Sequence, residues 1–243
     1  MIFKGTIKEI YYYLWLKKYM DNEKYIVKRL LSEGDVALIV GASYGMFTRC
    51  CSECVGDTGR VLSFEPVKET FHILASNVEK YNLMNVELFN YAIWDKQGAV
   101  KMTVPKFGKG FFWFFLKNYY TASISDEGNI LVRTIRLDDL YPLVEKDGVD
   151  FIKVDGNLTK YPAMRGAKQL IAKYEPAMLL EAGPDTHKPV FDLLYSWGYD
   201  AYRINEDKLV KYKEGDKRHG ANCFFLKEKH IKKMNAAGII QQE

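Results

Sequence analysis

The chain of 243 residues is long enough for one large domain with a buried core, and it is short for two. Hydrophobic residues make up 48% of the chain and charged residues 27%, as in globular proteins, and the formal net charge is only +4. This small charge disfavours a nucleic-acid binder, which would more often carry a basic stripe with interleaved aromatic residues. We interpret the lysines, which are densest at Lys227, Lys229, Lys232 and Lys233, as a solvated face.

No apolar run approaches the roughly 18 to 20 residues of a membrane span, and charges interrupt the N-terminus where a signal peptide would be apolar. Cys50, Cys51 and Cys54 lie within one short segment, but no second pair and no nearby histidine completes a metal site. We therefore expect thiols on the buried side of a helix, no metal, no transmembrane segment and a reduced, cytoplasmic setting.

The first predicted element is a helix over residues 8–31, where apolar residues recur with helical spacing as far as Gly34. It belongs to an N-terminal segment, 1–33, that we expect to pack on the core. Beyond it, short apolar runs predict strands, and longer amphipathic stretches predict helices. The predicted strands are 37–40, 61–64, 86–89, 150–154, 177–181, 199–204 and 221–226, and the predicted helices between them are 44–55, 67–81, 162–174 and 188–197.

Strands that alternate with helices indicate an α/β fold, here a Rossmann-like, mostly parallel sheet of seven strands with helices on both faces. The last two strands lie close together in the sequence and predict an antiparallel hairpin at one edge. We expect the domain to cover 34–230, followed by a C-terminal tail at 231–243. An insertion at 104–129 is rich in aromatic residues and contains Gly108 and Gly110 as pivots. We interpret it as a lid or contact surface, with a flap packed on the core as the alternative.

Two features indicate where a ligand would bind. The first strand ends at Gly41-Ala42-Ser43-Tyr44-Gly45, whose glycines allow a tight turn and a close approach to a ligand at a helix N-terminus. The second strand ends at Glu65, whose carboxylate can accept hydrogen bonds from both hydroxyls of a ribose. Both features have a purely structural alternative. The glycines would then be ordinary turn residues, and Glu65 would be a solvent-facing acid before a helix. Together they indicate a cofactor that carries a nucleoside.

A nicotinamide cofactor and a nucleoside triphosphate are disfavoured, because the chain has no G-x-G-x-x-G and no phosphate-loop lysine. The stretch from Gly34 to Thr48 resembles the opening motif of FkbM-type methyltransferases. Further similar segments follow in the family's order and spacing: Gly59–Pro66, Asn82–Val86, Ala92–Gly98, Thr134–Leu140, Phe151–Asp155, Arg165–Ala167 and Leu179–Glu181. The resemblance extends to about Leu226 and implies a class I methyltransferase fold. It also implies S-adenosylmethionine as methyl donor and, commonly, a hydroxyl oxygen as acceptor.

The resemblance also implies roles for individual residues. The cofactor-binding set would be Gly41, Ala42, Ser43 and Gly45 along the methionine and ribose, Glu65 on the ribose hydroxyls, and Tyr91, Ala92 and Ile93 around the adenine. Asp155, at the end of the fourth strand, would face the methyl group.

Methyl transfer from a sulfonium to an oxygen needs a collinear acceptor and a base that takes the hydroxyl proton. Asp155 is the first candidate for this base and His187 is the second, since an imidazole titrates near neutral pH. Glu181 would orient the acceptor hydroxyl or the base. A surface or packing role is the alternative for His187, and a pair with a nearby lysine is the alternative for Glu181.

Three positions depart from the family pattern. Ile39 stands where the family usually has an acid that helps to anchor the amino-acid end of the cofactor, and Asn157 and Lys160 replace two acids that usually follow Asp155. We therefore weigh two functions: O-methylation of a small-molecule or carbohydrate-like acceptor, and a catalytically impaired relative that binds the cofactor or a partner without turnover. An RNA-modifying enzyme is a third reading, which the modest charge disfavours.

Overall fold

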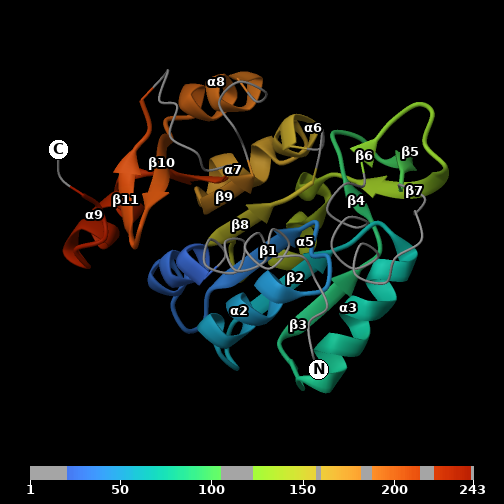
Figure 1. Cartoon of the computed structure of the whole chain (residues 1–243), viewed down its shortest axis with the longest axis horizontal. Coiled ribbons are helices and arrows are strands. Elements are labelled where there is room, and N and C mark those ends of the chain that lie inside the picture. Colours follow the sequence, from blue (N-terminus) through green and yellow to red (C-terminus); the bar gives the residue numbers. More distant parts are fainter. Residues whose placement is uncertain (1–20, 105–122, 157–159, 182–187, 214–221, 242–243) are drawn as a thin grey trace, which may run out of the picture.

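The first strand, β1 (Val36–Val40), accounts for the layered architecture, because all five of its residues are buried. Alternate side chains enter two different hydrophobic clusters: Val36, Leu38 and Val40 enter one, and Ala37 and Ile39 enter the other. A strand buried on both faces lies inside a sheet that helices cover on both sides. The computed structural model, which describes residues 21–104, 123–156, 160–181, 188–213 and 222–241, has this arrangement (Figure 1).

The central sheet has eight strands in the order β11-β10-β12-β9-β8-β1-β2-β3. Besides β1 they are β2 (Arg60–Phe64), β3 (Val86–Phe89), β8 (Phe151–Val154), β9 (Ala177–Glu181), β10 (Asp200–Asn205), β11 (Lys208–Lys211) and β12 (Asn222–Leu226). The five strands from β9 to β3 are parallel to one another. The strand order reverses at β1, which lies between β2 and β8, and in open parallel sheets ligands bind beyond the carboxyl ends of the strands at such a point.

The predicted fold class is confirmed, but two details of the sheet were wrong. The seven predicted strands are present, and an eighth, β11, was missed because it is only four residues long and buries one side chain, Leu209. The final two predicted strands do pair antiparallel. However, β12 lies inside the sheet between β10 and β9, and β10 with β11 forms the hairpin at the edge.

A second, smaller sheet was also missed. Its order is β4-β7-β5-β6, and its strands are β4 (Ala92–Ile93), β5 (Gly98–Thr103), β6 (Ser123–Ile124) and β7 (Ile130–Ile135). Its core is a small cluster of four buried side chains, so the sequence shows no long apolar run there. Residues 105–122, the larger part of the insertion predicted as a lid or contact surface, lie between β5 and β6 and outside the described residues.

The helices cover the central sheet in two layers (Figure 1). The helix at residues 21–30, α2 (Met46–Val55), α3 (Lys68–Lys80) and α9 (Glu228–Ala236) pack on the face that carries Ile39. The other face carries the short helix η1 (Leu137–Leu140), α5 (Tyr141–Val144), α6 (Lys160–Arg165), α7 (Lys168–Tyr174) and α8 (Lys188–Ser196). The part of the predicted first helix before residue 21 lies outside the described residues. Cys50, Cys51 and Cys54 are free thiols on α2, and the first two are buried, as predicted.

The single helix predicted over 162–174 is two helices, α6 and α7. Gly166 separates them, and a Cβ at this position would lie 2.2 Å from the carbonyl oxygen of Trp94. Asp138 of η1 then supports the start of α7, because its Oδ1 accepts a hydrogen bond of 2.9 Å from the N–H of Leu170. A carboxylate from a distant segment thus accepts a hydrogen bond from the first turn of α7, as an N-cap side chain usually does. The sequence next to α7 does not indicate this contact.

The C-terminal lysines Lys229, Lys232 and Lys233 are exposed, as the interpretation as a solvated face predicts, whereas Lys227 is half-buried, and three of the four also contact other helices. Lys227, Lys229 and Lys233 donate hydrogen bonds to the carbonyl oxygens of Trp197 (2.5 Å), Tyr174 (2.9 Å) and Leu30 (2.7 Å). These acceptors stand at the ends of α8, α7 and the helix 21–30, where carbonyl groups lack partners within their own helix. The lysines therefore join α9 to three helices, and the boundary predicted at residue 230 falls inside α9.

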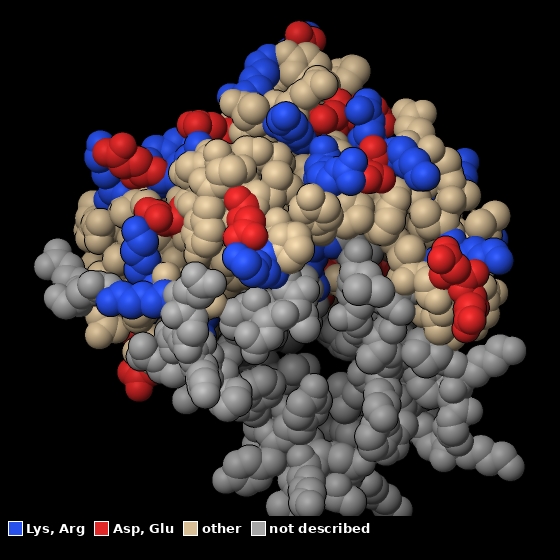
Figure 2. All heavy atoms as spheres, turned by 90° about the horizontal axis from the view of Figure 1, so that it is seen from above, with Lys and Arg blue, Asp and Glu red and all other residues tan. Residues whose placement is uncertain are grey.

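None of the helices in the described part of the chain has the length and hydropathy of a membrane span. On the face shown in Figure 2, Lys and Arg side chains are interspersed with Asp and Glu and do not gather into one stripe.

Candidate functional site

The loop after β1 has an unusual backbone conformation. Gly41, Ser43 and Gly45 have φ values of 74°, 51° and 88°. A non-glycine residue at positive φ is uncommon, and the surrounding structure must offset its cost. The N–H of Ser43 donates a hydrogen bond of 2.9 Å to Oε2 of Glu65, and Nδ2 of Asn77 donates one of 2.8 Å to the carbonyl oxygen of Tyr44. The end of β2 and the helix α3 thus hold the loop from two sides.

Packing and backbone conformation together require both motif glycines. A Cβ on Gly41 would lie 2.5 Å from the carbonyl oxygen of Asp155, and a Cβ on Gly45 would lie 2.7 Å from Cδ1 of Leu74. At Gly41 the clash is with the backbone at the end of β8 and would force the loop away, whereas at Gly45 a side chain is the neighbour and the φ of 88° is the stronger requirement for glycine. The glycines therefore bring the loop against Asp155, whose N–H donates a hydrogen bond of 3.0 Å to the carbonyl oxygen of Val40.

Glu65 is a buried carboxylate with a relative exposure of 6%, so the alternative reading as a solvent-facing acid was wrong. Its Oε2 accepts from Ser43, and its Oε1 accepts a hydrogen bond of 3.0 Å from the N–H of Val67. Burial raises the pKa of Glu65 to about 7, against the two backbone hydrogen bonds that lower it, and the charge of Asp155 adds to the rise. Each carboxylate oxygen has two lone pairs, so both retain the capacity to accept one more hydrogen bond.

The hydroxyl of Ser43 is a second unusual group in the loop. Its Oγ is buried and has no hydrogen-bond partner in the described part of the chain. A buried polar atom without a partner costs about 1–3 kcal/mol, so native structures normally satisfy such an atom with protein, water or ligand. The hydroxyl is therefore suited to receive a polar group of a bound molecule.

Asp155 is joined to a buried lysine. Its Oδ2 lies 2.7 Å from Nζ of Lys153, and the two side chains are 30% and 4% exposed, respectively. Nζ of Lys153 also lies 4.5 Å from the centre of the Phe47 ring. In the sheet, Lys153 is next to Ile39 on one side and Leu179 on the other. Position 39 is apolar here, and Asp155 supplies a negative charge directly beside the buried lysine.

The residues predicted to bind the adenine, Tyr91, Ala92 and Ile93, follow the end of β3. The hydroxyl of Tyr91 accepts a hydrogen bond of 2.7 Å from Arg133, whose guanidinium lies 4.5 Å from the ring centre. Ala92 and Ile93 form β4, and their side chains are buried in hydrophobic clusters. Asn90, which sequence reasoning missed, is joined more directly, because its Nδ2 donates to the carbonyl oxygen of Glu65 at 2.8 Å. An amide directly after the third strand was the available signal.

Other predicted residues are only partly described. Glu181 is the last residue of β9, and its backbone pairs with Asn222, but its side chain lies outside what the structure describes. His187 and Asn157 also fall outside the described residues. Lys160 begins α6 and is buried, with a relative exposure of 1%. Within the described residues, no group of three His, Cys, Asp or Glu side chains could hold a metal ion.

The loop 41–45, Glu65, Asn90 and Asp155 thus converge at the carboxyl ends of four neighbouring strands, β1, β2, β3 and β8. The model of the methyltransferase FkbM domain matches residues 40–201, which is more than half of the chain and includes all of these residues. The chain belongs to the FkbM methyltransferase family. The matched region of this FkbM chain begins at the last residue of β1 and ends in β10.

Solved structures of methyltransferases are similar to the FkbM chain. The methyltransferase FkbM from Methylobacillus flagellatus KT is 15% identical, with a TM-score of 0.53, over 79% of this chain and 43% of that chain. An S-adenosylmethionine-dependent O-methyltransferase from Thermotoga maritima is 13% identical, with a TM-score of 0.46, over 86% of this chain and 64% of that chain. The FkbM chain therefore spans less than two thirds of either protein. At such identity, the likeness to the first structure shows the fold.

Proposed function

We propose that this FkbM-family chain is an S-adenosylmethionine-dependent methyltransferase that methylates a hydroxyl oxygen of a small-molecule or carbohydrate-like acceptor. The observation that carries the proposal is the contact of one loop with the carboxylate of Glu65 and the backbone of Asp155 at the point where the strand order reverses. The loop 41–45 meets Glu65 through the N–H of Ser43 and packs on the backbone of Asp155 through Gly41. This is the place where open parallel sheets bind nucleoside-bearing ligands.

The loop 41–45 and Glu65 have the hydrogen-bonding groups that S-adenosylmethionine requires. Glu65 would accept hydrogen bonds from the two ribose hydroxyls with its remaining lone pairs. Gly41, Ala42 and Gly45 would line the methionine and ribose, and the Oγ of Ser43 would gain a partner there. Tyr91, Ala92 and Ile93 would border the adenine. When bound, this cofactor supplies a methyl group on a positively charged sulfur.

Asp155 is the proposed residue that faces the acceptor hydroxyl. Its Oδ2 is bonded to Lys153, which fixes the orientation of the carboxylate. Because Lys153 holds this oxygen, Asp155 is suited to hold the hydroxyl in line with the methyl group. His187 would then take the proton and Glu181 would orient the acceptor. These two roles complete the proposal.

The second candidate is a relative that binds the cofactor without turnover. Two observations favour it: Ile39 is buried where the family usually has an acid, and Lys153 occupies one oxygen of Asp155. An RNA-modifying enzyme has less support, because the face shown in Figure 2 mixes cations with anions.

Calorimetry with S-adenosylmethionine and its demethylated product tests the proposal. Glu65→Ala should weaken binding of both by roughly 10- to 150-fold, since a hydrogen bond to a charged group contributes about 1.5–3 kcal/mol. The control is Glu69→Ala, which removes an exposed carboxylate from the first turn of α3 and should leave the affinity unchanged. No binding by the folded, unmodified chain would refute the cofactor assignment. Firm binding without turnover of any hydroxyl acceptor would support the second candidate.

A further inference from the structure

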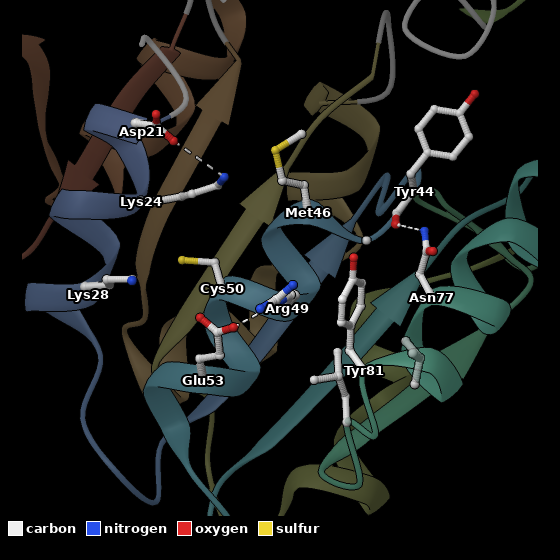
Figure 3. Close-up of a pocket in the computed structure, with 13 residues that line it drawn as sticks. Asp21, Lys24, Lys28, Tyr44, Met46, Arg49, Cys50, Glu53, Asn77 and Tyr81 are labelled. Atoms are coloured by element: carbon white, nitrogen blue, oxygen red, sulfur yellow. Dashed lines mark hydrogen bonds and ion pairs between the residues drawn. The ribbon is translucent and has the colours of Figure 1, made fainter. Parts of the chain in front are cut away.

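The outer side of the loop 41–45 borders a hollow in the protein surface. A cleft of about 480 Å³ opens between the helix 21–30, α2 and α3 (Figure 3). Tyr44 and Gly45 form part of its wall, whereas Glu65 and Asp155 do not line it. Ligand pockets in proteins commonly have a volume of about 300–1,000 Å³, so the cleft is large enough for a small organic molecule.

One wall of the cleft is cationic. Lys24 and Lys28 stand one helical turn apart, and both project from the helix 21–30 towards α2, where Arg49 lies (Figure 3). Two acids oppose them: Asp21 lies 3.8 Å from Lys24, and Glu53 lies 2.7 Å from Arg49.

Asp21 pairs with Lys24 and Glu53 pairs with Arg49, so neither acid of the cleft pairs with Lys28. Within the described residues it forms no ion pair, and its side chain is exposed. Lys28 is close enough to α2 to act on Cys54 of that helix. The pKa of the Cys54 thiol is lowered mainly by a hydrogen bond with Cys50 and, to a smaller extent, by the charge of Lys28. Three cations against two acids leave the cleft with a net positive charge.

The opposite wall is contributed by α2, α3 and the loop that follows α3, and it presents apolar side chains beside Arg49 and Glu53. Tyr81 and Met46 are 45% and 41% exposed, and Val78 and Leu83 complete this surface. The guanidinium of Arg49 lies 4.2 Å from the centre of the Tyr81 ring and is bonded to Glu53, so its orientation is set before any ligand arrives. An oriented guanidinium loses little freedom when it binds an oxyanion.

We propose that this cleft is a second binding site, which takes a small organic anion: a phosphate or carboxylate group on a flat or apolar body. Lys24, Lys28 and Arg49 bind the oxyanion through charge-assisted hydrogen bonds, which are stronger than neutral ones. Tyr81 and Met46 contact the body of the ligand. Because Tyr44 and Gly45 line the cleft while Ser43 donates to Glu65, the ligand touches the outer side of the loop that lines the proposed cofactor site.

Phenyl phosphate is the probe, with inorganic phosphate and phenol as its two halves, and all three are titrated into the full chain without S-adenosylmethionine. Backbone amide signals from α2 and α3, those of Arg49 and Tyr81 above all, should shift with phenyl phosphate. Phenyl phosphate should bind more tightly than either half. Lys28→Glu should weaken its binding at least about tenfold, since it turns an attractive charge into a repulsive one.

Two matched controls separate this site from the cofactor site. Lys68→Glu reverses an exposed charge on α3 outside the cleft, and Glu65→Ala alters the proposed cofactor site. Lys68→Glu should leave the affinity for phenyl phosphate unchanged, and Glu65→Ala should change it much less than Lys28→Glu does, because Glu65 reaches the cleft only through the loop 41–45. The proposal is overturned if phenyl phosphate does not bind at millimolar concentration, or if Lys28→Glu binds it unchanged. Equal affinity for either half, or equal weakening by Glu65→Ala, would also overturn it. None of these results depends on methyl transfer.

Discussion

The two partners of the ion pair between Lys153 and Asp155 are unequally buried, and we therefore predict that their single substitutions lower the stability by unequal amounts. Lys153 is 4% exposed and lies between Ile39 and Leu179, whereas Asp155 is 30% exposed and can be partly hydrated. Removal of one partner of a buried pair costs about 3–5 kcal/mol, because the remaining charge loses its compensation. Asp155→Asn should therefore lower the free energy of unfolding by about 3 kcal/mol, since it removes the negative charge that lies 2.7 Å from a buried ammonium group.

Lys153→Met should cost less, about 1 kcal/mol, because the remaining carboxylate reaches water. The double variant should be within about 1 kcal/mol of the unmodified protein, since methionine suits the apolar neighbours and no charge remains uncompensated. The asymmetry also affects the assay of catalysis: lost turnover in Asp155→Asn reports on chemistry only at a temperature where that variant is folded.

Urea unfolding of the four proteins, with the midpoint and the slope measured separately, gives the coupling between the two residues. The pair Lys232–Glu228 is the matched control, because its N···O distance is also 2.7 Å while its side chains are 74% and 80% exposed. Its coupling should stay below about 1 kcal/mol. Equal losses in the two single variants of the buried pair, or a coupling no larger than that of the control, would refute the reasoning.

Two further predictions concern Glu65 and Lys233. The folded pKa of Glu65, about 7, lies above its ordinary value of 4.5, so its contribution to stability is present below pH 4.5 and is lost as the pH rises through 7. This loss amounts to about 3 kcal/mol. The urea midpoint of the unmodified protein should thus fall more between about pH 5 and 8 than that of Glu65→Gln, and parallel profiles would contradict the assignment. Lys233→Met should lower the free energy of unfolding by about 1 kcal/mol, because the carbonyl of Leu30 loses its donor. Lys232→Met is its control, and equal thermal unfolding of the two variants would show that the contact to Leu30 contributes nothing.

The strands buried on both faces were predictable, because burial leaves a continuous apolar run in the sequence. β1 and β9 were predicted to within one residue at either end for this reason. β11 and the small sheet were not predictable in the same way. Their strands bury few side chains, and pairing with distant segments stabilises them, as β5 pairs with β7.

The candidate site was predictable as a set of strand ends, because the carboxyl ends of parallel strands meet at one edge of the sheet. Gly41, Glu65 and Asp155 come together there as the order of strands requires. Their environments were not predictable. The sequence around a carboxylate at the end of a strand is the same whether the group is solvated or buried. Glu65 is buried under a loop, and its pKa is raised.

The amino-acid sequence by itself determined the alternation of strands and helices, the family and the residues at the strand ends, because hydrophobic periodicity and motif spacing are local properties of the chain. Only the tertiary structure decided that Lys153 is bonded to Asp155, that three lysines of the C-terminal region support the ends of other helices, and that Lys24 and Lys28 face Arg49 across a cleft. The physical reason is that the sequence around a charged residue does not indicate which group its side chain will contact in the fold. Burial and the approach of distant segments determine whether that charge remains in water, forms a buried ion pair, or faces a cleft where a ligand can reach it.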